Sequence, residues 1–146
     1  MLALLISACL FLHCSSLIKK CPNTVTHGTL ILFKIDGCKM NKCVFHSGHH
    51  MTGSVRFIPH TKSDKLLATM SAKIGQHHFI MPDFKGNGCR ASGVNCTIVP
   101  NEPYVYRFSA IIPYVVMATK TMIRFTLSND NNAYLVCVEV PVEFRP

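Results

Sequence analysis

The sequence predicts an all-β domain, an antiparallel β-sandwich, on three observations. Apolar and polar residues alternate through most of the chain after residue 28, whereas the i, i+3, i+4 spacing of an amphipathic helix is scarce. Turn-forming pairs such as Asp36-Gly37 and Ser47-Gly48 separate the alternating runs. No helical pattern lies between consecutive strands, which favours two packed antiparallel sheets over a parallel sheet.

Six strands are expected from the alternation. The clearest has one buried face formed by Leu66, Ala68, Met70, Ala72 and Ile74. Residues 123–127 and 137–144 alternate in the same way, and further strands are predicted over residues 28–35, 53–58 and 104–111. The remaining turns are predicted at residues 59–64, 82–88, 100–103 and 128–132.

The first sixteen residues resemble a secretory signal peptide. An uncharged apolar run over residues 1–12 is followed by Cys14, Ser15 and Ser16, which suits cleavage after about Ser16. No Lys or Arg precedes the run, so a buried N-terminal strand is the alternative. We expect a leader over residues 1–16, a single domain over residues 17–146, and a protein that is secreted or resides in the endosomal or lysosomal lumen. No later stretch has the length of a transmembrane helix.

Cysteine spacing indicates a disulfide framework. Removal of the leader leaves six of the eight cysteines: Cys21, Cys38, Cys43, Cys89, Cys96 and Cys137. In an oxidising compartment this even number predicts three disulfides, and fifteen connectivities are formally open. Local spacing suggests the pairs Cys38–Cys43 and Cys89–Cys96, which leaves Cys21 to pair with Cys137. Neither close pair has the second pair that a zinc site requires, and C-x-x-C is absent, so we expect neither metal nor cofactor.

The charge favours anionic partners. Fifteen Lys and Arg stand against seven Asp and Glu, a formal net charge of +8. These residues are scattered among apolar ones, and no basic stripe with stacking aromatics indicates a nucleic-acid module. A solvated polar face explains most of them.

The order of the cysteines and two local motifs resemble the ML family of secreted lipid-recognition domains, which includes sterol-transfer proteins and mite allergens. The most specific parts are GNGCRASGVNC, ending at Cys96, and YLVCVEVPVEF, which contains Cys137. The resemblance covers the chain from about Cys21 to Phe144.

The resemblance implies an immunoglobulin-like sandwich with an apolar ligand cavity between its two sheets. It also implies the pairings Cys21–Cys137, Cys38–Cys43 and Cys89–Cys96. By analogy with the sterol carriers, the mouth of the cavity should lie between residues 79–84 and 111–117. This sequence departs from the sterol carriers there, because residues 77–82 read HHFIMP and residues 115–117 read VVM.

The expected lipid contacts are apolar residues of the inward strand faces and of the mouth, although each taken singly is more often plain core. They are Val55, Phe57, Leu66, Met70, Ile74, Phe79, Phe84, Phe108, Ile112, Val116, Met117, Ile123, Phe125, Val138 and Val140.

The sequence therefore predicts a secreted, monomeric protein that binds and transfers a sterol, fatty acid or similar lipid. It would touch anionic membranes transiently and pass its cargo to a membrane, a receptor or a transporter. The alternatives are an immune or recognition module that presents bound lipid to a receptor, and a cationic glycan binder. No nucleophile elbow or close carboxylate pair indicates an enzyme.

Two groups of histidines give one further hypothesis, that acidic pH strengthens docking on anionic membranes. His46, His49 and His50 are close in sequence, as are His77 and His78. Plain surface histidine is the simpler interpretation. Neighbouring strand residues point to opposite faces, so His77 and His78 are not expected to chelate one ion together.

Overall fold

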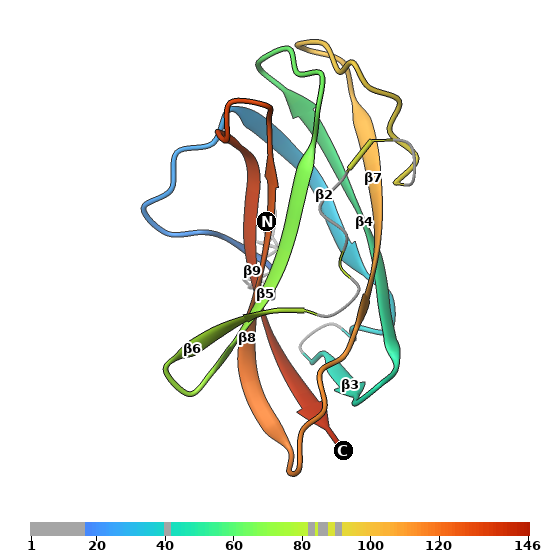
Figure 1. Ribbon diagram of the computed structural model, residues 1–146, viewed down its shortest axis with the longest axis vertical. Helices are drawn as coiled ribbons and strands as arrows, with labels where there is room; N and C mark the ends of the chain where they lie inside the picture. The colour runs from blue at the N-terminus through green and yellow to red at the C-terminus, as the bar shows by residue number, and fades with distance from the viewer. Residues whose placement is uncertain (1–16, 40–41, 82–83, 85–87, 90–91) are drawn as a thin grey trace, which may run out of the picture.

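The computed structural model describes residues 17–39, 42–81, 84, 88–89 and 92–146. Figure 1 shows two sheets packed face to face. One sheet has the strand order β1-β9-β8-β5-β6, with β3 also paired to β9; the other has the order β2-β4-β7. The strands are β1 (Lys19–Lys20), β2 (Gly28–Ile35), β3 (Val44–His46), β4 (His50–Pro59), β5 (Leu67–Ile74), β6 (His77–Ile80), β7 (Tyr104–Ile111), β8 (Thr119–Ser128) and β9 (Tyr134–Arg145).

The all-β sandwich is confirmed, and the six long strands lie where the alternation predicts them. β2 and β7 have the predicted bounds, and β5 buries Leu66, Ala68, Met70 and Ala72 on one face. The short strands β1 and β3 were not predicted, because two or three residues are too few to show a period. β3 pairs with β9 in parallel, so the larger sheet is not purely antiparallel.

β9 organises the larger sheet. It pairs with β8 along one edge, while β1 and β3 share its other edge around residues 138–139 and 143–145. The backbone N–H of Glu143 donates to the carbonyl of Cys43, so odd-numbered residues of β9 direct their N–H toward the edge with β1 and β3. Pro141, which has no N–H, falls in the gap between these two short strands, where no ladder bond is lost.

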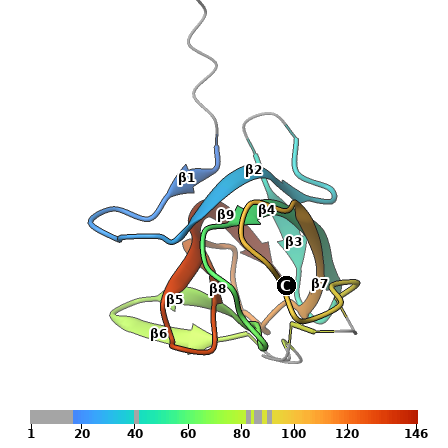
Figure 2. The ribbon, with the colours of Figure 1, turned by 90° about the horizontal axis from the view of Figure 1, so that it is seen from above.

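Three disulfides form, with the pairings that the family resemblance implies: Cys21–Cys137, Cys38–Cys43 and Cys89–Cys96. The first joins cysteines that are 116 residues apart in the sequence, and it fixes the segment around β1 against β9. Figure 2 shows this segment lying over β2 and β9 at one side of the sandwich. Within the described ranges, the chain contains no helix of the length and apolarity needed to cross a membrane. The predicted leader, residues 1–16, lies outside the described residues.

We expect the disulfides to contribute unequally to stability. In the chain-entropy account, a bond that closes 116 residues contributes about 5 kcal/mol, whereas one that closes five contributes about 2 kcal/mol. Replacing Cys21 and Cys137 together by Ala should therefore lower the free energy of unfolding in urea about twice as much as replacing Cys38 and Cys43 together. Equal losses for the two double variants would contradict this ranking.

Candidate functional site

The interior between the sheets is centred on five aromatic rings, here called the aromatic cluster: Phe33, Phe84, Tyr106, Phe108 and Phe125. The ring of Phe125, on β8, lies with its centroid 5.5 Å from those of Phe33 on β2 and Phe108 on β7. Phe84 stands edge-on to Phe125 at 6.1 Å. These are favourable aromatic geometries, and they join both sheets at one point.

Most of the residues predicted to contact lipid lie in this interior. Ten are buried: Val55, Phe57, Leu66, Met70, Phe108, Ile112, Ile123, Phe125, Val138 and Val140. Ile74 and Phe84 are partly buried. The other three are exposed, with 49% of Phe79, 95% of Val116 and 68% of Met117 accessible to solvent. The prediction thus divides into an enclosed apolar set and an exposed set at one end of the sandwich.

Two glycines make room for the rings. Gly53 on β4 lies opposite Phe108 in the register, and a Cβ at Gly53 would stand 2.5 Å from Cζ of Phe108. Gly88 lies against Leu66 and Tyr106, where a Cβ would come within 2.7 Å and 3.0 Å of their side chains. Any larger residue at either position would displace a ring of the aromatic cluster or Leu66.

The disulfide loop Cys89–Cys96 and the residue before it connect the open edges of the two sheets. Gly88 N–H donates to the carbonyl of Leu66, at the start of β5, over 2.7 Å. Arg107 N–H, on β7, donates to the carbonyl of Ser92 over 2.9 Å. The hydroxyl of Ser92 in turn donates to the carbonyl of Gly88. The loop therefore spans from the larger sheet to the smaller one beside Phe84.

Sequence reasoning omitted Phe33 and Tyr106 from the expected lipid contacts. Phe33 lies in a continuous apolar run, and the register of β2 shifts between Leu30 and Leu32, so strict alternation does not single it out. Tyr106 alternates with Phe108 along β7, and that shared strand face could have identified it. Both are buried, with 5% and 3% of their surface exposed.

Tyr106 carries the one ionisable group of the aromatic cluster. Burial raises its pKa from the ordinary value of 10.0 to about 12, because the phenolate is poorly solvated between the sheets. The un-ionised phenol is thus the favoured form in the folded protein. Its contribution to stability is complete below about pH 10 and is lost as the pH rises through about 12.

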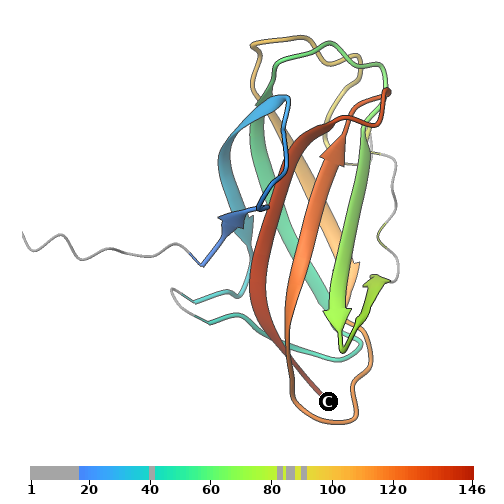
Figure 3. The ribbon, with the colours of Figure 1, turned by 90° about the vertical axis from the view of Figure 1, so that its left-hand side faces the viewer.

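An exposed apolar group, here called the lip, occupies the end of the sandwich near the β5–β6 turn: Phe79, Tyr114, Val116 and Met117. Figures 1 and 3 show the segment between β7 and β8 at the same end as this turn. The segment is anchored at its base, since Ile112 N–H donates to the carbonyl of His49 and Val115 N–H to Oγ of Ser47. Beyond that anchor, Val116 and Met117 project into solvent.

His77, on β6 with Phe79, and His49, whose carbonyl accepts from Ile112 N–H, lie near the lip. The ring of His77 is 6.3 Å from that of Phe79, and His46 and His49 have centroids 6.0 Å apart. In the part of the chain that the structure describes, no three His, Cys, Asp or Glu side chains are arranged to hold a metal ion.

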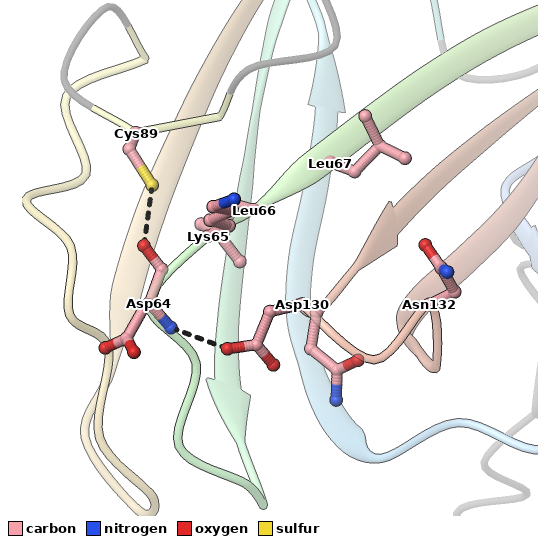
Figure 4. Close-up of a pocket in the computed structure, with 8 residues that line it drawn as sticks. Asp64, Lys65, Leu66, Leu67, Cys89, Asp130 and Asn132 are labelled. Carbon is pink, nitrogen blue, oxygen red and sulfur yellow. Dashed lines mark hydrogen bonds between the residues drawn. The ribbon is translucent and has the colours of Figure 1, made fainter.

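A cleft of about 570 Å³ lies at the opposite end, where β5 begins. Figure 4 shows Asp64 and Asp130 there, with the backbone N–H of Asp64 donating to Oδ2 of Asp130 over 3.1 Å. Oδ1 of Asp64 accepts from the Thr97 hydroxyl at 2.6 Å. The Cys89 sulfur lies 3.9 Å from the Asp64 carbonyl, as a contact rather than a hydrogen bond, because a disulfide sulfur carries no proton. Both carboxylates thus fasten loops together.

We predict that one tyrosine ionises late. Ultraviolet titration of the folded protein should show a phenolate step at about pH 12 that Tyr106→Phe removes. The measurement requires folded protein, so circular dichroism should be recorded at each pH. A titration curve that is unchanged by Tyr106→Phe, with the protein still folded, would contradict the burial of this phenol.

Comparison with known proteins finds relatives in sequence and a solved structure with a similar fold. NPC intracellular cholesterol transporter 2 of Danio rerio is 27% identical over 116 residues, which are 80% of this chain and 77% of the relative. Mite group 2 allergen Lep d 2 of Lepidoglyphus destructor is 25% identical over 105 residues, 72% of this chain and 73% of the allergen. The crystal structure of a Niemann-Pick type C2 protein from Japanese carpenter ant has the same fold, with a TM-score of 0.75 at 18% identity over 88% of this chain and 98% of that one.

A family model described as the ML domain matches residues 15–144, nearly the whole chain. This match confirms the resemblance that the cysteine order and the two motifs indicate. The chain belongs to the ML domain family.

Proposed function

We propose that this protein binds a lipid, a sterol or a fatty acid, between its two sheets and transfers it to membranes. The observation that carries the proposal is the aromatic cluster, an apolar centre that joins the sheets and continues into buried aliphatic residues on every side. Family membership supports the proposal, since one relative is named as a cholesterol transporter. Three disulfides suit a protein of the secretory pathway.

Loading requires the rings to separate. The centroids of the aromatic cluster lie 5.5 to 6.3 Å apart, so the rings touch one another. A ligand would replace these contacts with its own and push the sheets apart. The unpaired edges, β6 of the larger sheet and β7 of the smaller, are where the sheets can part, because neither edge is held by a further ladder strand. Phe84 stands at that side and would move first.

The interior suits a ligand with few polar groups. Almost all side chains of the core are hydrocarbon or thioether, and its buried methionines, Met51, Met70 and Met81, can adapt to different ligand shapes. A sterol of about 28 heavy atoms, at about 0.3 kcal/mol per atom, would bind with about 8 kcal/mol, a dissociation constant near 1 µM. Such an affinity permits both loading and release.

The deciding experiment is mass spectrometry of lipids extracted from the protein purified from culture medium, combined with displacement of a fluorescent sterol and a fluorescent fatty acid. We expect a co-purifying lipid in roughly equimolar amount and displacement of at least one probe. Purified protein that carries no lipid and binds neither probe would refute the proposal.

We predict that Phe84→Ala weakens probe binding about tenfold, because the Phe84 ring, once separated from Phe108 and Phe125, would contact the ligand, and an aromatic contact is worth about 0.5–1.5 kcal/mol beyond its buried area. Tyr134→Ala is the matched control. Tyr134 is also aromatic and only partly shielded, but it begins β9 at the far end of the sandwich. Equal loss of binding in the two variants would place the ligand outside the aromatic cluster.

We also propose that the lip contacts the membrane during transfer. Val116, Tyr114 and Met117 expose between 68% and 95% of their surface, which is unfavourable in water and favourable at a bilayer interface. The net charge of +8 favours transient contact with anionic lipids.

Val116→Asp should slow transfer of a fluorescent sterol from the protein to vesicles of phosphatidylcholine and phosphatidylserine, without changing sterol affinity. Val25→Asp introduces the same change at a residue that is 78% exposed on the segment between β1 and β2, away from the lip, and should transfer at the rate of the unmodified protein. A rate that is equal in both variants would exclude the lip as the docking surface. Fast loading with no unaided transfer would instead favour presentation of the lipid to a protein receptor.

A further inference from the structure

The outer face of the larger sheet carries a second feature, distinct from the interior and the lip. Figure 3 views this face, with β9, β8 and β5 side by side. Since Ile123 and Phe125 are buried against the smaller sheet, the alternating residues Met122 and Arg124 point outward. The outward residues include six cations and two carboxylates: Lys19, Lys42, Lys73, Lys120, Arg124, Arg145, Glu139 and Glu143.

The carboxylates on this face are already engaged. Arg124 pairs with Glu139 at 3.6 Å, and Arg145 and Lys42 pair with Glu143 at 3.4 and 3.9 Å. The hydrogen bond and charge of Arg145 hold the pKa of Glu143 below its usual range, so this carboxylate stays ionised. Lys73 forms no ion pair with a described carboxylate. Lys120 is opposite Glu143 in the register and helps to lower its pKa, but forms no ion pair within 4 Å with a described carboxylate. The face therefore keeps a positive charge that is not matched within the molecule.

The unmatched lysines border two depressions of about 390 Å³ each. Lys73, His78, Met122, Arg124 and Glu139 line one depression. Lys120 lines the other, together with Lys42, Pro141 and Glu143. Met122, 40% exposed, lines the first depression and lies opposite Pro141, which lines the second, in the register of β8 and β9. Lys120 and Arg124, which line different depressions, are four residues apart on one strand, a spacing of about 13 Å at about 3.3 Å per residue.

We propose that this face, which we call the cationic face, binds an acidic segment of a partner protein. An extended chain with acidic residues at positions i and i+4 and an apolar residue at i+2 has the same spacing, so that its carboxylates enter the two depressions and its apolar side chain covers Met122. An apolar centre with a charged rim, containing Met and Arg, is the usual composition of a protein interface.

Other occupants fit this face less well. A second copy of the chain would bring the same cations against it, and like charges repel. A membrane would meet Met122 and Pro141 at the centre and the exposed Ile80 at the β6 edge, but the interleaved Glu139 and Glu143 would repel anionic headgroups. The lip, which carries the exposed Tyr and Val, is the better membrane contact. Acidic protein and lipid docking can thus use separate surfaces of the molecule.

The test uses a fluorescent peptide with the pattern Glu-Ala-Leu-Ala-Glu and a control peptide of the same composition with the two glutamates adjacent. Fluorescence anisotropy at low ionic strength should show tighter binding of the first peptide, weakened by added salt. The double variant K73E/K120E should bind it at least about tenfold more weakly. Met122→Ser should also weaken binding, without any change in charge.

The matched control is K34E/R56E, which changes the net charge equally on the outer face of the smaller sheet. It should bind the peptide as the unmodified protein does. Equal losses of peptide affinity in both double variants would assign binding to net charge alone. Equal affinity for the two peptides would refute the two-site spacing. Either result overturns the proposal. It is likewise overturned if K73E/K120E releases the protein from phosphatidylserine vesicles but leaves peptide binding intact. None of these readouts requires bound lipid, so they are independent of the proposed transfer function.

Discussion

The contact of Phe125 with rings from both sheets is the interaction on which the rest of the structure depends. Phe125 lies on β8, the strand between β9 and β5, and it meets Phe33 of β2 and Tyr106 and Phe108 of β7. Each aromatic pair contributes about 0.5–1.5 kcal/mol beyond the burial of its area. Because these contacts are made at one point rather than along a continuous ladder, they hold the sheets together and are also the contacts that a ligand between the sheets would replace.

The two sides of the sandwich differ in how firmly they are closed. On the side of β1, the Cys21–Cys137 disulfide and the pairing of Lys19 and Lys20 with β9 tie the chain down covalently. On the side of β6 and β7, the described residues are joined by hydrogen bonds around the Cys89–Cys96 loop: Gly88 to Leu66, Arg107 to Ser92, the reciprocal pair of Ser63 and Ile98, and Thr97 to Asp64. Hydrogen bonds of this kind contribute about 0.5–1.5 kcal/mol each. Opening should therefore occur at the second side, which is the side of Phe84.

The surface features of different chemical character also lie in separate regions of the molecule. The lip gathers apolar residues at one end, the cleft at Asp64 and Asp130 gathers loop-fastening hydrogen bonds at the other, and the cationic face lies along the sheet between them. Because strand alternation directs neighbouring residues such as Met122 and Ile123 to opposite sides, the amino acids of the interior, the lip and the cationic face can be changed independently of one another. A change on the outer face therefore need not disturb the interior that is proposed to bind lipid.

The sequence by itself determined the six long strands and the family and predicted a secretory compartment, because period-two alternation, cysteine number and cysteine order are local or countable properties. It also identified Phe125, Phe108 and Met70 as interior residues, since each lies in an unbroken alternating run. It did not identify Phe33, where the register shift in β2 breaks the alternation, or the parallel strand β3. Only the tertiary structure decided which residues meet across the sheets, and only it placed Lys73, Lys120 and Arg124 around Met122, because strand register, unlike strand identity, depends on partners distant in sequence.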